Sequence, residues 1–506
     1  MRRIGAALRR LWTARPGWGR LGFLTLCGIG LALGLEPFRL WPLALIALAA
    51  GMALVVREGR PGAAAWAGFA FGLGHFGLAL VWIVSPFLVD AASYGWMAPF
   101  AVVLMAAGMA LFWALAAGVS ALVTRRMLGL VAALSAVELA RCYVLTGFPW
   151  AQPGQVMIGT PLDQVAALVG GNGLTALVIG VAGLLAVMRP VPVIAGLAIF
   201  GGVWGFGAAQ LAKPAPAPQG ALLRLVQPNA EQNLKWDPAQ AATFFDRLLA
   251  ETSAPPADGQ PRPDLVIWPE TALPYLVERQ PELVSIITDA AKGAAVAVGR
   301  DRIEGMQGWN NLTIYDAGGA ELGSYDKHHL VPFGEYIPLG DLMYDLFGVT
   351  AFTARTGRAF TAGPGPQVLD LGPMLGKVLP LICYEADFPQ DVRGAPIRAD
   401  WILQVTNDAW FGTFSGPFQH AAQSRLRAIE AGLPLVRVGN TGVTEVVDAR
   451  GRVRASLPFG TQGHLDAVLP GALPITPYMR FGDLPLLVWL AGCAGLTFRR
   501  RRTPSA

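Results

Sequence analysis

Residues 380–389, PLICYEADFP, place one cysteine between an apolar run and a short acidic segment that a proline closes. The apolar residues before Cys383 are typical of a buried strand, and Pro389 marks where that segment ends. Cys383 is the only cysteine between Cys142 and Cys493. Loops at strand ends are where α/β proteins collect functional side chains. The segment therefore predicts an α/β domain with a thiol at one strand end.

The composition of the whole chain indicates that much of it lies in lipid. Of 506 residues, 53% are hydrophobic and 14% are charged, and the mean hydropathy is +0.45. A soluble chain carries about a quarter charged residues. The long apolar runs lie within 21–211 and 484–498, whereas 221–470 has the composition of a soluble domain. We therefore predict a helical bundle of about seven spans at 1–212, an α/β domain at 219–472, and a last span with a basic tail at 473–506.

Apolar segments near the roughly 20 residues that a spanning helix needs predict the membrane crossings. They lie near 21–38, 41–56, 63–84, 96–122, 128–146, 165–188, 191–211 and 483–498. Basic residues cluster at both ends of the chain and in alternate loops, which by the positive-inside rule places both termini in the cytoplasm. The α/β domain would then lie outside the cytoplasm. The net charge of +5 is explained by this topology and does not indicate nucleic-acid binding.

The predicted export of the α/β domain makes its single cysteine unusual. Cys27, Cys142 and Cys493 fall within or at the end of predicted membrane helices, where a cysteine is usually a small apolar residue. Exported proteins normally pair their cysteines, and an unpaired thiol is open to oxidation. Cys383 therefore needs either deep burial or a chemical role.

Two other predicted strands end in charged residues that complement a thiol. The run DLVIWPE ends in Glu270, and ELGSYDK ends in Lys327. Either charge taken alone is more simply a surface residue beside a turn. A thiol with a pKa of about 8.5 is a poor nucleophile near neutral pH, and it needs a base and a stabilising cation. The three residues together therefore predict a Glu270–Lys327–Cys383 catalytic set.

Several motifs resemble those of the carbon–nitrogen hydrolase (nitrilase) superfamily. They are WPET at 268–271, YDKHHLVPFGEYIP at 325–338 and ICYE at 382–385. That resemblance implies an αββα sandwich with a Glu–Lys–Cys triad. With the membrane helices, QPNAEQNLKW at 227–236 and TNDAWFG at 406–412, the whole chain resembles the bacterial apolipoprotein N-acyltransferase family.

The resemblance assigns roles to individual residues. It makes Glu270 the general base, Lys327 the electrostatic stabiliser and Cys383 the nucleophile. The backbone N–H of Tyr384 would help to bind the oxyanion, and Glu335 would orient Lys327. The remaining implied positions are Glu385 as a supporting residue and Trp236, Asn310 and Trp410 near the acyl-chain and thioester site.

The resemblance also implies a two-step acyl transfer through a Cys383 thioester. The donor would be a membrane phospholipid, typically phosphatidylethanolamine, and the acceptor the free α-amino group of an S-diacylglyceryl cysteine at the start of an apolipoprotein. The enzyme would need no cofactor and would lie in the bacterial inner membrane, with its catalytic domain on the periplasmic face. The segment YDLFGVTAF at 344–352 suits either a lipid-facing lid or an ordinary core helix.

Other interpretations remain open on the sequence alone. A membrane-tethered amidase of the nitrilase type would share the triad, and a degenerate scaffold would lack an intact one. The histidines His328, His329 and His420 have no ligand spacing that predicts a metal, and a structural role is favoured for them. Glu138 and Arg141, three residues apart in a predicted span, are expected to form a structural pair near the outer interface, with contact to a lipid headgroup as the alternative.

Overall fold

The computed structural model describes residues 17–124, 126–235, 237–257, 259–338 and 359–499. The chain forms two compact units, and each is described by itself. The first comprises residues 1–213, 411–422 and 476–506, and the second comprises 214–410 and 423–475. Residues 411–422 thus belong to the first unit although the sequence on both sides belongs to the second. The boundaries 1–212, 219–472 and 473–506 remain predictions.

The first unit consists of helices built from the apolar runs. Proline stands in the first turn of several of them, as at Pro61 and Pro190, where its missing N–H leaves no intrahelical bond unmade. Short 3₁₀ helices at Val81–Ile83, Gly95–Met97, Pro153–Met157 and Pro161–Val165 join some of the α-helices. The α-helices are α2 (Trp18–Ala32), α3 (Trp41–Val55), α4 (Pro61–Ala79), α5 (Val84–Leu88), α6 (Ala91–Tyr94), α7 (Ala98–Val123), α8 (Met127–Ala140), α9 (Ala166–Ala186), α10 (Pro190–Leu211), α17 (Pro477–Phe481) and α18 (Leu484–Arg499).

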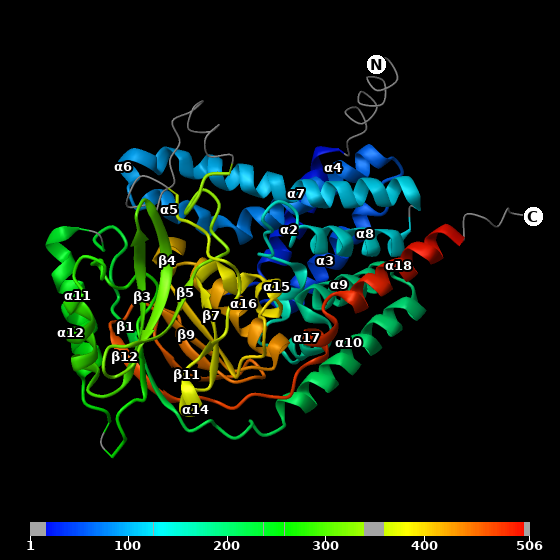
Figure 1. Cartoon of the computed structure of the whole chain (residues 1–506). Coiled ribbons are helices and arrows are strands. Elements are labelled where there is room, and N and C mark those ends of the chain that lie inside the picture. Colours follow the sequence, from blue (N-terminus) through cyan, green and yellow to red (C-terminus); the bar gives the residue numbers. More distant parts are fainter. Residues whose placement is uncertain (1–16, 125, 236, 258, 339–358, 500–506) are drawn as a thin grey trace, which may run out of the picture. The chain divides into compact units, whose positions relative to one another are not determined.

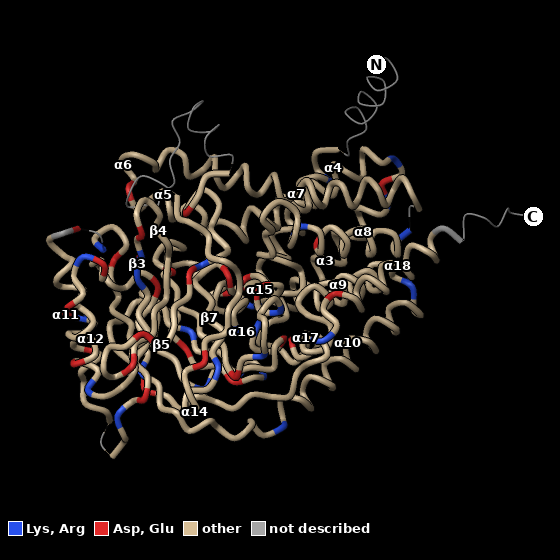
Figure 2. The backbone as a smooth tube through the Cα atoms, in the orientation of Figure 1, with Lys and Arg blue, Asp and Glu red and all other residues tan. Residues whose placement is uncertain are grey.

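Within the described residues, three helical stretches are long and apolar enough to cross a membrane. They are Ala91–Val123, Pro161–Ala186 and Pro190–Leu211. The pair Pro61–Ala79 and Val81–Leu88, bent by 57°, gives a fourth if it is one span, and four shorter apolar helices lie at Trp18–Ala32, Trp41–Val55, Met127–Ala140 and Leu484–Thr497. Figure 2 shows almost no charge along α7 and α10. An apolar helix lies at each predicted span, but the count of eight crossings remains a prediction.

Helices α2 and α4 approach each other closely because small residues face one another. A Cβ at Gly28 would overlap the backbone of α4, and a Cβ at Gly74 would overlap the backbone at Thr25. The Thr25 hydroxyl donates a hydrogen bond to the Ala70 carbonyl at 3.2 Å. Small residues and interhelical hydrogen bonds are the usual basis of helix packing where lipid removes the hydrophobic driving force.

A buried ion pair lies inside the first unit, as the sequence predicted for Glu138 and Arg141. Arg141 Nη2 lies 2.7 Å from Glu138 Oε2, and both side chains are 1% exposed. Trp113 Nε1 donates to Glu138 Oε1 at 2.7 Å. Arg141 Nη1 donates to the carbonyls of Phe148 and Trp150, each at 2.7 Å. The pair is therefore confirmed, while its place near the outer interface remains a prediction.

The second unit contains two six-stranded sheets. The first has the order β12-β1-β2-β3-β4-β5 and the second the order β11-β10-β9-β8-β7-β6. Strands β1, β2 and β3 run parallel, as do β7, β8 and β9, and the outer strands pair antiparallel. The strands are β1 (Leu222–Gln227), β2 (Leu265–Ile267), β3 (Ala295–Glu304), β4 (Gln307–Tyr315), β5 (Glu321–Asp326), β6 (Leu369–Asp370), β7 (Lys377–Ile382), β8 (Trp401–Thr406), β9 (Leu435–Gly439), β10 (Thr444–Val447), β11 (Val453–Leu457) and β12 (Gly463–Val468).

Helices cover the sheets and complete the predicted αββα sandwich. Helices α11 (Pro238–Ser253) and α12 (Glu282–Ala291) lie along the first sheet (Figure 1), where Leu248 and Ile287 join its buried core. The two sheets contact each other through β1 with β9 and β4 with β7. The other helical segments of the α/β region are α14 (Gly372–Leu375), α15 (Pro389–Arg393), α16 (Gly416–Ala431) and short 3₁₀ helices at Cys383–Asp387 and Asp408–Phe411.

Candidate active site

The three residues of the predicted catalytic set gather at strand ends of both sheets. Glu270 lies three residues beyond β2, Lys327 directly follows β5, and Cys383 directly follows β7. All three are buried, with 6%, 1% and 6% of their surfaces exposed. The charges of Glu270 and Lys327 both act on the Cys383 thiol. The fold thus brings a carboxylate, an amine and a thiol together within one water-poor region.

Lys327 lies between two carboxylates. Its Nζ donates to Glu335 Oε1 at 2.9 Å and lies 3.7 Å from Glu270 Oε1. Burial favours the neutral amine, but the charges of Glu335 and Glu270 outweigh it and raise the pKa of Lys327 above its ordinary value. Lys327 is therefore a permanent cation. Glu335 binds it directly and leaves Glu270 outside hydrogen-bonding range of the amine.

Amide groups hold the Glu270 carboxylate from two sides. Asn310 Nδ2 donates to Glu270 Oε1 at 2.7 Å and to Glu335 Oε1 at 3.1 Å. The backbone N–H of Asn407 donates to Glu270 Oε2 at 2.7 Å. Asn310 is 2% exposed, so its amide fixes the spacing of the two carboxylates. Contact between Asn310 and an acyl chain remains a prediction.

The backbone at Glu270 is fixed by its neighbours. A Cβ at Gly299 would overlap the Pro269 carbonyl, so only glycine lets β3 approach this segment. The Ala272 N–H donates to the Gly299 carbonyl at 2.8 Å. Lys235 Nζ donates to the Glu270 carbonyl at 3.2 Å and to Thr271 Oγ1 at 2.8 Å. These contacts hold the backbone of Glu270 in place.

Cys383 occupies a strained turn at the end of β7. Its φ of 53° lies in the left-handed region, which a non-glycine residue adopts at a cost of about 1–3 kcal/mol. Gln404 Nε2 donates to the Cys383 carbonyl at 3.2 Å. Burial and then the charge of Glu270 raise the pKa of the Cys383 thiol well above its ordinary value, against the opposing effects of Lys327 and a hydrogen bond with Thr406. The resting thiol is therefore protonated, and it needs a base to become a nucleophile.

Glu385 ties the cysteine turn to the loop after Lys327. Its Oε2 accepts from the Ile382 N–H at 2.7 Å, immediately before Cys383. Its Oε1 accepts from the Tyr325 hydroxyl at 2.8 Å and from the His328 N–H at 2.9 Å. Glu385 is fully buried. This carboxylate therefore positions two parts of the site.

Three potential metal ligands, His328, His329 and Asp391, lie close together next to this turn. His328 Nδ1 lies 2.7 Å from Glu385 Oε1, and His329 Nδ1 lies 3.0 Å from Asp391 Oδ2. Burial opposes a charge on His328, but hydrogen bonds to Asp391 and Glu385 raise its pKa to about 10. A protonated imidazole offers no lone pair to a metal. The hydrogen bonds therefore indicate an ion-pair network that braces the turn.

Of the remaining predicted site residues, the structure describes Tyr384 and Trp410 but not Trp236. Tyr384 is buried, and its ring contacts those of His329 and Phe388 with centroid separations of 5.6 and 4.7 Å. Trp410 is half-buried in the 3₁₀ helix Asp408–Phe411. Trp236 and the segment 344–352 lie outside the described residues. The roles predicted for all of these residues remain predictions.

Two groups of residues that hold the site were not singled out from the sequence. One is Asn407, which binds Glu270 and whose side chain donates to Gln232 Oε1 at 2.7 Å. The other begins with Thr406, whose hydroxyl donates to Asp408 Oδ1 at 2.9 Å, while Arg437 donates to Asp408 Oδ2 at 2.7 Å. The motif TNDAWFG, quoted for the family resemblance, contains Thr406, Asn407 and Asp408. That these three residues hold the site could be seen only from their contacts in the structure.

The arrangement suits covalent acyl transfer. A held carboxylate can accept the thiol proton, and a permanent cation can stabilise both the thiolate and a developing oxyanion. Glu335 offsets the charge of Lys327, so the Glu270 carboxylate does not have to bond the amine directly. The low exposure of the three groups limits the access of water to a thioester.

Family models match both parts of the chain. Residues 27–184 match the apolipoprotein N-acyltransferase N-terminal domain. Residues 222–472 match the carbon–nitrogen hydrolase domain. Among solved structures, a CN-hydrolase superfamily protein from Xanthomonas campestris is 22% identical over 49% of this chain and 90% of its own, with a TM-score of 0.36. An amidase from Nesterenkonia is 21% identical over 55% of this chain and 98% of its own, also with a TM-score of 0.36.

Curated relatives match nearly the whole chain. The apolipoprotein N-acyltransferase of Caulobacter vibrioides is 40% identical over 94% of this chain and 94% of its own length. That of Bradyrhizobium diazoefficiens is 38% identical over 99% of this chain and 98% of its own. With the αββα sandwich and the apolar helical unit, these matches show that the chain belongs to the apolipoprotein N-acyltransferase family.

Proposed function

We propose that this chain transfers a fatty acyl group from a membrane phospholipid to the free α-amino group of an S-diacylglyceryl cysteine that begins an apolipoprotein. The observation that carries the proposal is the buried grouping of Glu270, Lys327 and Cys383 in a member of this family. The apolar helices of the first unit suit an enzyme with two lipid substrates. Phosphatidylethanolamine is the proposed donor.

In the first half-reaction, Cys383 Sγ attacks the ester carbonyl of the phospholipid while its proton passes to Glu270. Lys327 and the backbone N–H of Tyr384 stabilise the oxyanion. The ester C–O bond then breaks, and the leaving glycerol oxygen takes the proton from Glu270. The products are a Cys383 thioester and a lysophospholipid. Glu270 returns to its charged form, ready for a second proton.

In the second half-reaction, the α-amino group of the acceptor attacks the thioester carbonyl. Glu270 takes a proton from the attacking nitrogen, the C–S bond breaks, and the thiolate is protonated again. An amide replaces the thioester, and the enzyme is regenerated. Hydrolysis of the thioester would release the acyl group as free fatty acid, so the proposed transfer requires that water be kept from the site.

The proposed location is the bacterial inner membrane, with the α/β unit on the periplasmic face and both termini in the cytoplasm. Cysteine introduced by Ala257→Cys should react with a membrane-impermeant thiol reagent only from the periplasmic side. Cysteine introduced by Gly59→Cys, in a predicted cytoplasmic loop with open space at its Cβ, is the matched control. Labelling of the Ala257→Cys variant from the cytoplasmic side alone would reverse the orientation.

Intact-protein mass spectrometry tests the function directly. Full-length protein incubated with phosphatidylethanolamine should gain one acyl group on Cys383, and the thioester should persist without an acceptor. A diacylglyceryl-cysteine peptide with a free amino terminus should then discharge it and become N-acylated. The same peptide with an acetylated amino terminus should not, because its nitrogen lone pair is delocalised.

The membrane-tethered amidase or hydrolase is the competing function, and the same experiment separates the two. A hydrolase would release free fatty acid at a rate that the peptide does not change. Cys383→Ala and Cys383→Ser serve as controls that should form no thioester, since a serine hydroxyl is too weakly acidic for one carboxylate to activate. Transfer by the alanine variant would exclude the covalent mechanism.

A further inference from the structure

The hydroxyl of Thr406 lies beside the sulfur of Cys383. Strands β7 and β8 run parallel with Ile382 opposite Val405, so the next residues along the two chains, Cys383 and Thr406, are neighbours. The Thr406 side chain forms a hydrogen bond with the Cys383 thiol, and Thr406 is fully buried. This hydroxyl therefore touches an atom that reacts, and the steps proposed for Glu270 leave it without a role.

The position of this hydroxyl is fixed by the backbone and by the branched side chain. The Asn440 N–H donates to the Thr406 carbonyl at 3.0 Å, and Thr406 lies opposite Gly439 where β8 pairs with β9. Gln404 Nε2 donates to the Cys383 carbonyl at 3.2 Å, which ties the ends of β7 and β8 together. A β-branched side chain has few favourable χ1 rotamers. The Thr406 oxygen is therefore held in place, and only its hydrogen can turn.

A buried ion pair competes for the one hydrogen that Thr406 can donate. The Thr406 hydroxyl donates to Asp408 Oδ1 at 2.9 Å. Arg437 Nη2 lies 2.7 Å from the other oxygen, Asp408 Oδ2, and both side chains are fully buried. Arg437 Nη1 donates to the Val443 carbonyl at 2.8 Å, which fixes the pair in turn. Thr406 thus has two possible acceptors, Asp408 and the sulfur of Cys383, for a single hydrogen.

The charge of the sulfur decides which acceptor is favoured. While the sulfur is a thiol, its S–H can donate to the Thr406 oxygen, and the Thr406 hydroxyl can donate to Asp408. A thiolate has no hydrogen to donate, and a charged acceptor forms a stronger hydrogen bond than a neutral one. A Thr406 hydroxyl that stayed on Asp408 would present an oxygen lone pair to this negative charge. A turn of the hydrogen towards the sulfur replaces that repulsion with a hydrogen bond.

We propose that Thr406 is a further catalytic residue, whose hydroxyl turns from Asp408 to the Cys383 sulfur whenever the sulfur carries negative charge. The inference rests on the proposed function, because it adds a group to the same reaction. In the first half-reaction, the thiol proton passes to Glu270, and Thr406 keeps its own proton while it donates to the thiolate. In the second, the electron pair of the breaking C–S bond returns to the sulfur, and the same hydroxyl stabilises it until the sulfur is protonated again.

Three charged groups act on the same sulfur. Burial and the charges of Glu270 and Asp408 raise the pKa of the Cys383 thiol, whereas the charge of Lys327 and the hydrogen bond of Thr406 lower it. Removal of the Thr406 hydroxyl leaves all three charges in place. Its loss should therefore make the thiolate harder to form and a poorer leaving group, without the large electrostatic change that removal of Lys327 would cause.

The rate at which iodoacetamide alkylates Cys383 measures thiolate formation without any lipid. Full-length protein in detergent is treated over a range of pH, and mass spectrometry of the peptide that contains Cys383 gives the rate at this cysteine alone. Thr406→Val keeps the size and the branching of the side chain but removes the hydroxyl. Below the pKa of the thiol, its alkylation rate should be about threefold lower or more, even though a less stabilised thiolate is more reactive. Thr406→Ser keeps the hydroxyl and should remain near the wild type.

The thioester assays extend the test to the two half-reactions. Thr406→Val should slow acylation of Cys383 by phosphatidylethanolamine by about 10–100-fold, because a hydrogen bond to a charged group is lost. After prolonged loading, the thioester of this variant should also react more slowly with hydroxylamine than that of the wild type, since a thiolate of higher pKa leaves more slowly. Hydroxylamine is small and needs no binding site for the apolipoprotein, so this step reports on the leaving group.

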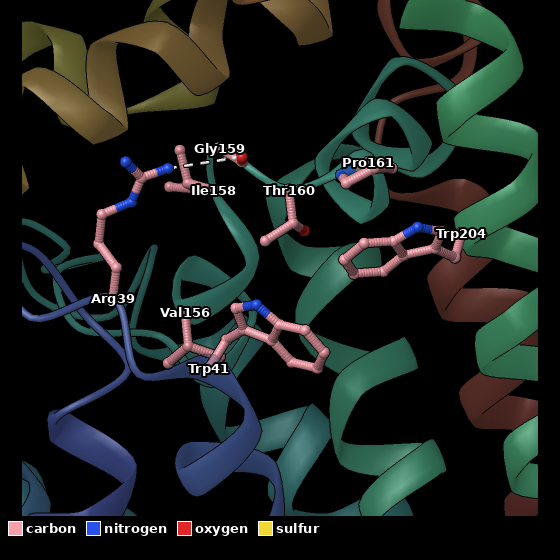
Figure 3. A pocket seen from close by; sticks show the side chains of 8 residues that line it. All are labelled: Arg39, Trp41, Val156, Ile158, Gly159, Thr160, Pro161 and Trp204. Carbon is pink, nitrogen blue, oxygen red and sulfur yellow. Dashed lines mark hydrogen bonds between the residues drawn. The ribbon is translucent and has the colours of Figure 1, made fainter.

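Thr160 in the first unit supplies the matched control. Its hydroxyl donates to the Met157 carbonyl at 2.7 Å, and the residue is buried. It lines a cavity of about 440 Å³ together with residues such as Arg39 and Trp204, all of the first unit (Figure 3), whereas Cys383 belongs to the second. Thr160→Val also removes a buried hydroxyl, and it should leave the alkylation and acylation rates per folded molecule unchanged.

Unchanged alkylation in Thr406→Val would overturn the proposal, and so would an equal loss in Thr406→Ser, because serine keeps the hydroxyl. If Thr406→Val does not fold, Thr406→Ala compared with Thr406→Ser makes the same test. Normal formation of the thioester in Thr406→Val contradicts this inference alone. A slower alkylation of Thr406→Val, in a protein whose wild type forms no thioester with phospholipid, contradicts only the proposed function.

Discussion

Each unit of this protein buries a cluster of opposite charges, and the two clusters differ in how their charges are paired. In the helical unit, Glu138 and Arg141 form one pair at 2.7 Å, and Arg141 Nε, Nη1 and Nη2 all donate to oxygens. In the α/β unit, one cation, Lys327, faces two carboxylates and a thiol. The first cluster pairs one carboxylate with one cation, whereas in the second a single amine, that of Lys327, lies within 4 Å of two carboxylates.

The difference bears on the role proposed for Glu270. Each side-chain nitrogen of Arg141 donates a hydrogen bond, and two of these bonds hold the carbonyls of Phe148 and Trp150. Glu335 takes the direct bond to Lys327, whereas Glu270 lies 3.7 Å from that amine and, among the described residues, accepts its hydrogen bonds from neutral amide donors. A carboxylate held in this way can still accept a proton. In the proposed mechanism, the carboxylate that acts as the base is therefore the one that lacks a direct hydrogen bond to the cation.

The largest effect should follow removal of the carboxylate of Glu270, the proposed base. Glu270→Gln keeps the shape of the side chain but removes the base, so thioester formation should fall by about 10²–10⁴-fold. Single-turnover mass spectrometry measures this rate, and circular dichroism checks the fold. Normal thioester yield in Glu270→Gln would show that the thiol proton goes elsewhere. Lys327→Ala should fail at the same step.

The matched change in the helical unit should act on stability and leave the chemistry intact. Glu138→Gln leaves Arg141 buried without a counter-charge, which costs about 3–5 kcal/mol when a buried pair is broken. The unfolding midpoint in detergent should fall clearly, while the thioester yield per folded molecule stays near that of the wild type. A large loss of chemistry in well-folded Glu138→Gln would contradict the contrast between the clusters.

Asn310 links Glu270 to Glu335, so its removal should loosen the site without destroying it. Asn310→Ala should lower the acylation rate about tenfold, with little change in the lipid concentration that gives half-maximal rate. Asn311→Ala is the control, because Asn311 is also buried but bonds Ser324 and Asp326. Equal losses of rate in the two variants would mean that the effect comes from the strand and not from the carboxylates.

The smallest effect concerns pH and the network behind the cysteine turn. The pKa of His328 is raised to about 10 in the folded protein, above about 6.5 in the unfolded chain. Its stabilisation is therefore complete below about pH 6.5 and is lost as the pH rises through about 10. The difference in unfolding midpoint between wild type and His328→Gln should shrink over that range.

Asp391→Asn serves as the check on that prediction, because it removes one of the two carboxylates that face His328. In that background the effect of His328→Gln at pH 7 should be smaller, since less of the favourable interaction remains. A difference between wild type and His328→Gln that stays constant from pH 6.5 to pH 10 would show that His328 is neutral in the folded protein.

Local sequence patterns were sufficient to predict much of the fold and two of the site residues. Uninterrupted apolar runs predicted a helix at each proposed span, because in lipid a helix satisfies its own backbone. Alternating strands and helices predicted the α/β unit, and charged residues at the ends of β2 and β5 pointed to Glu270 and Lys327. The resemblance of the quoted motifs added the αββα sandwich. These features depend on neighbouring residues, so they can be read along the chain.

Tertiary structure alone decided which groups touch. Strand β12 pairs with β1 from more than two hundred residues away, with Val468 opposite Leu222, and neither β6 nor β11 carries a distinctive pattern. Asn407 and Asn310 reach Glu270 from different sheets, and Glu385 joins two loops that are separate in sequence. Whether a buried charge is fully paired depends on such distant partners. That pairing separates Glu270, the proposed base, from Glu138, and no local run of sequence contains it.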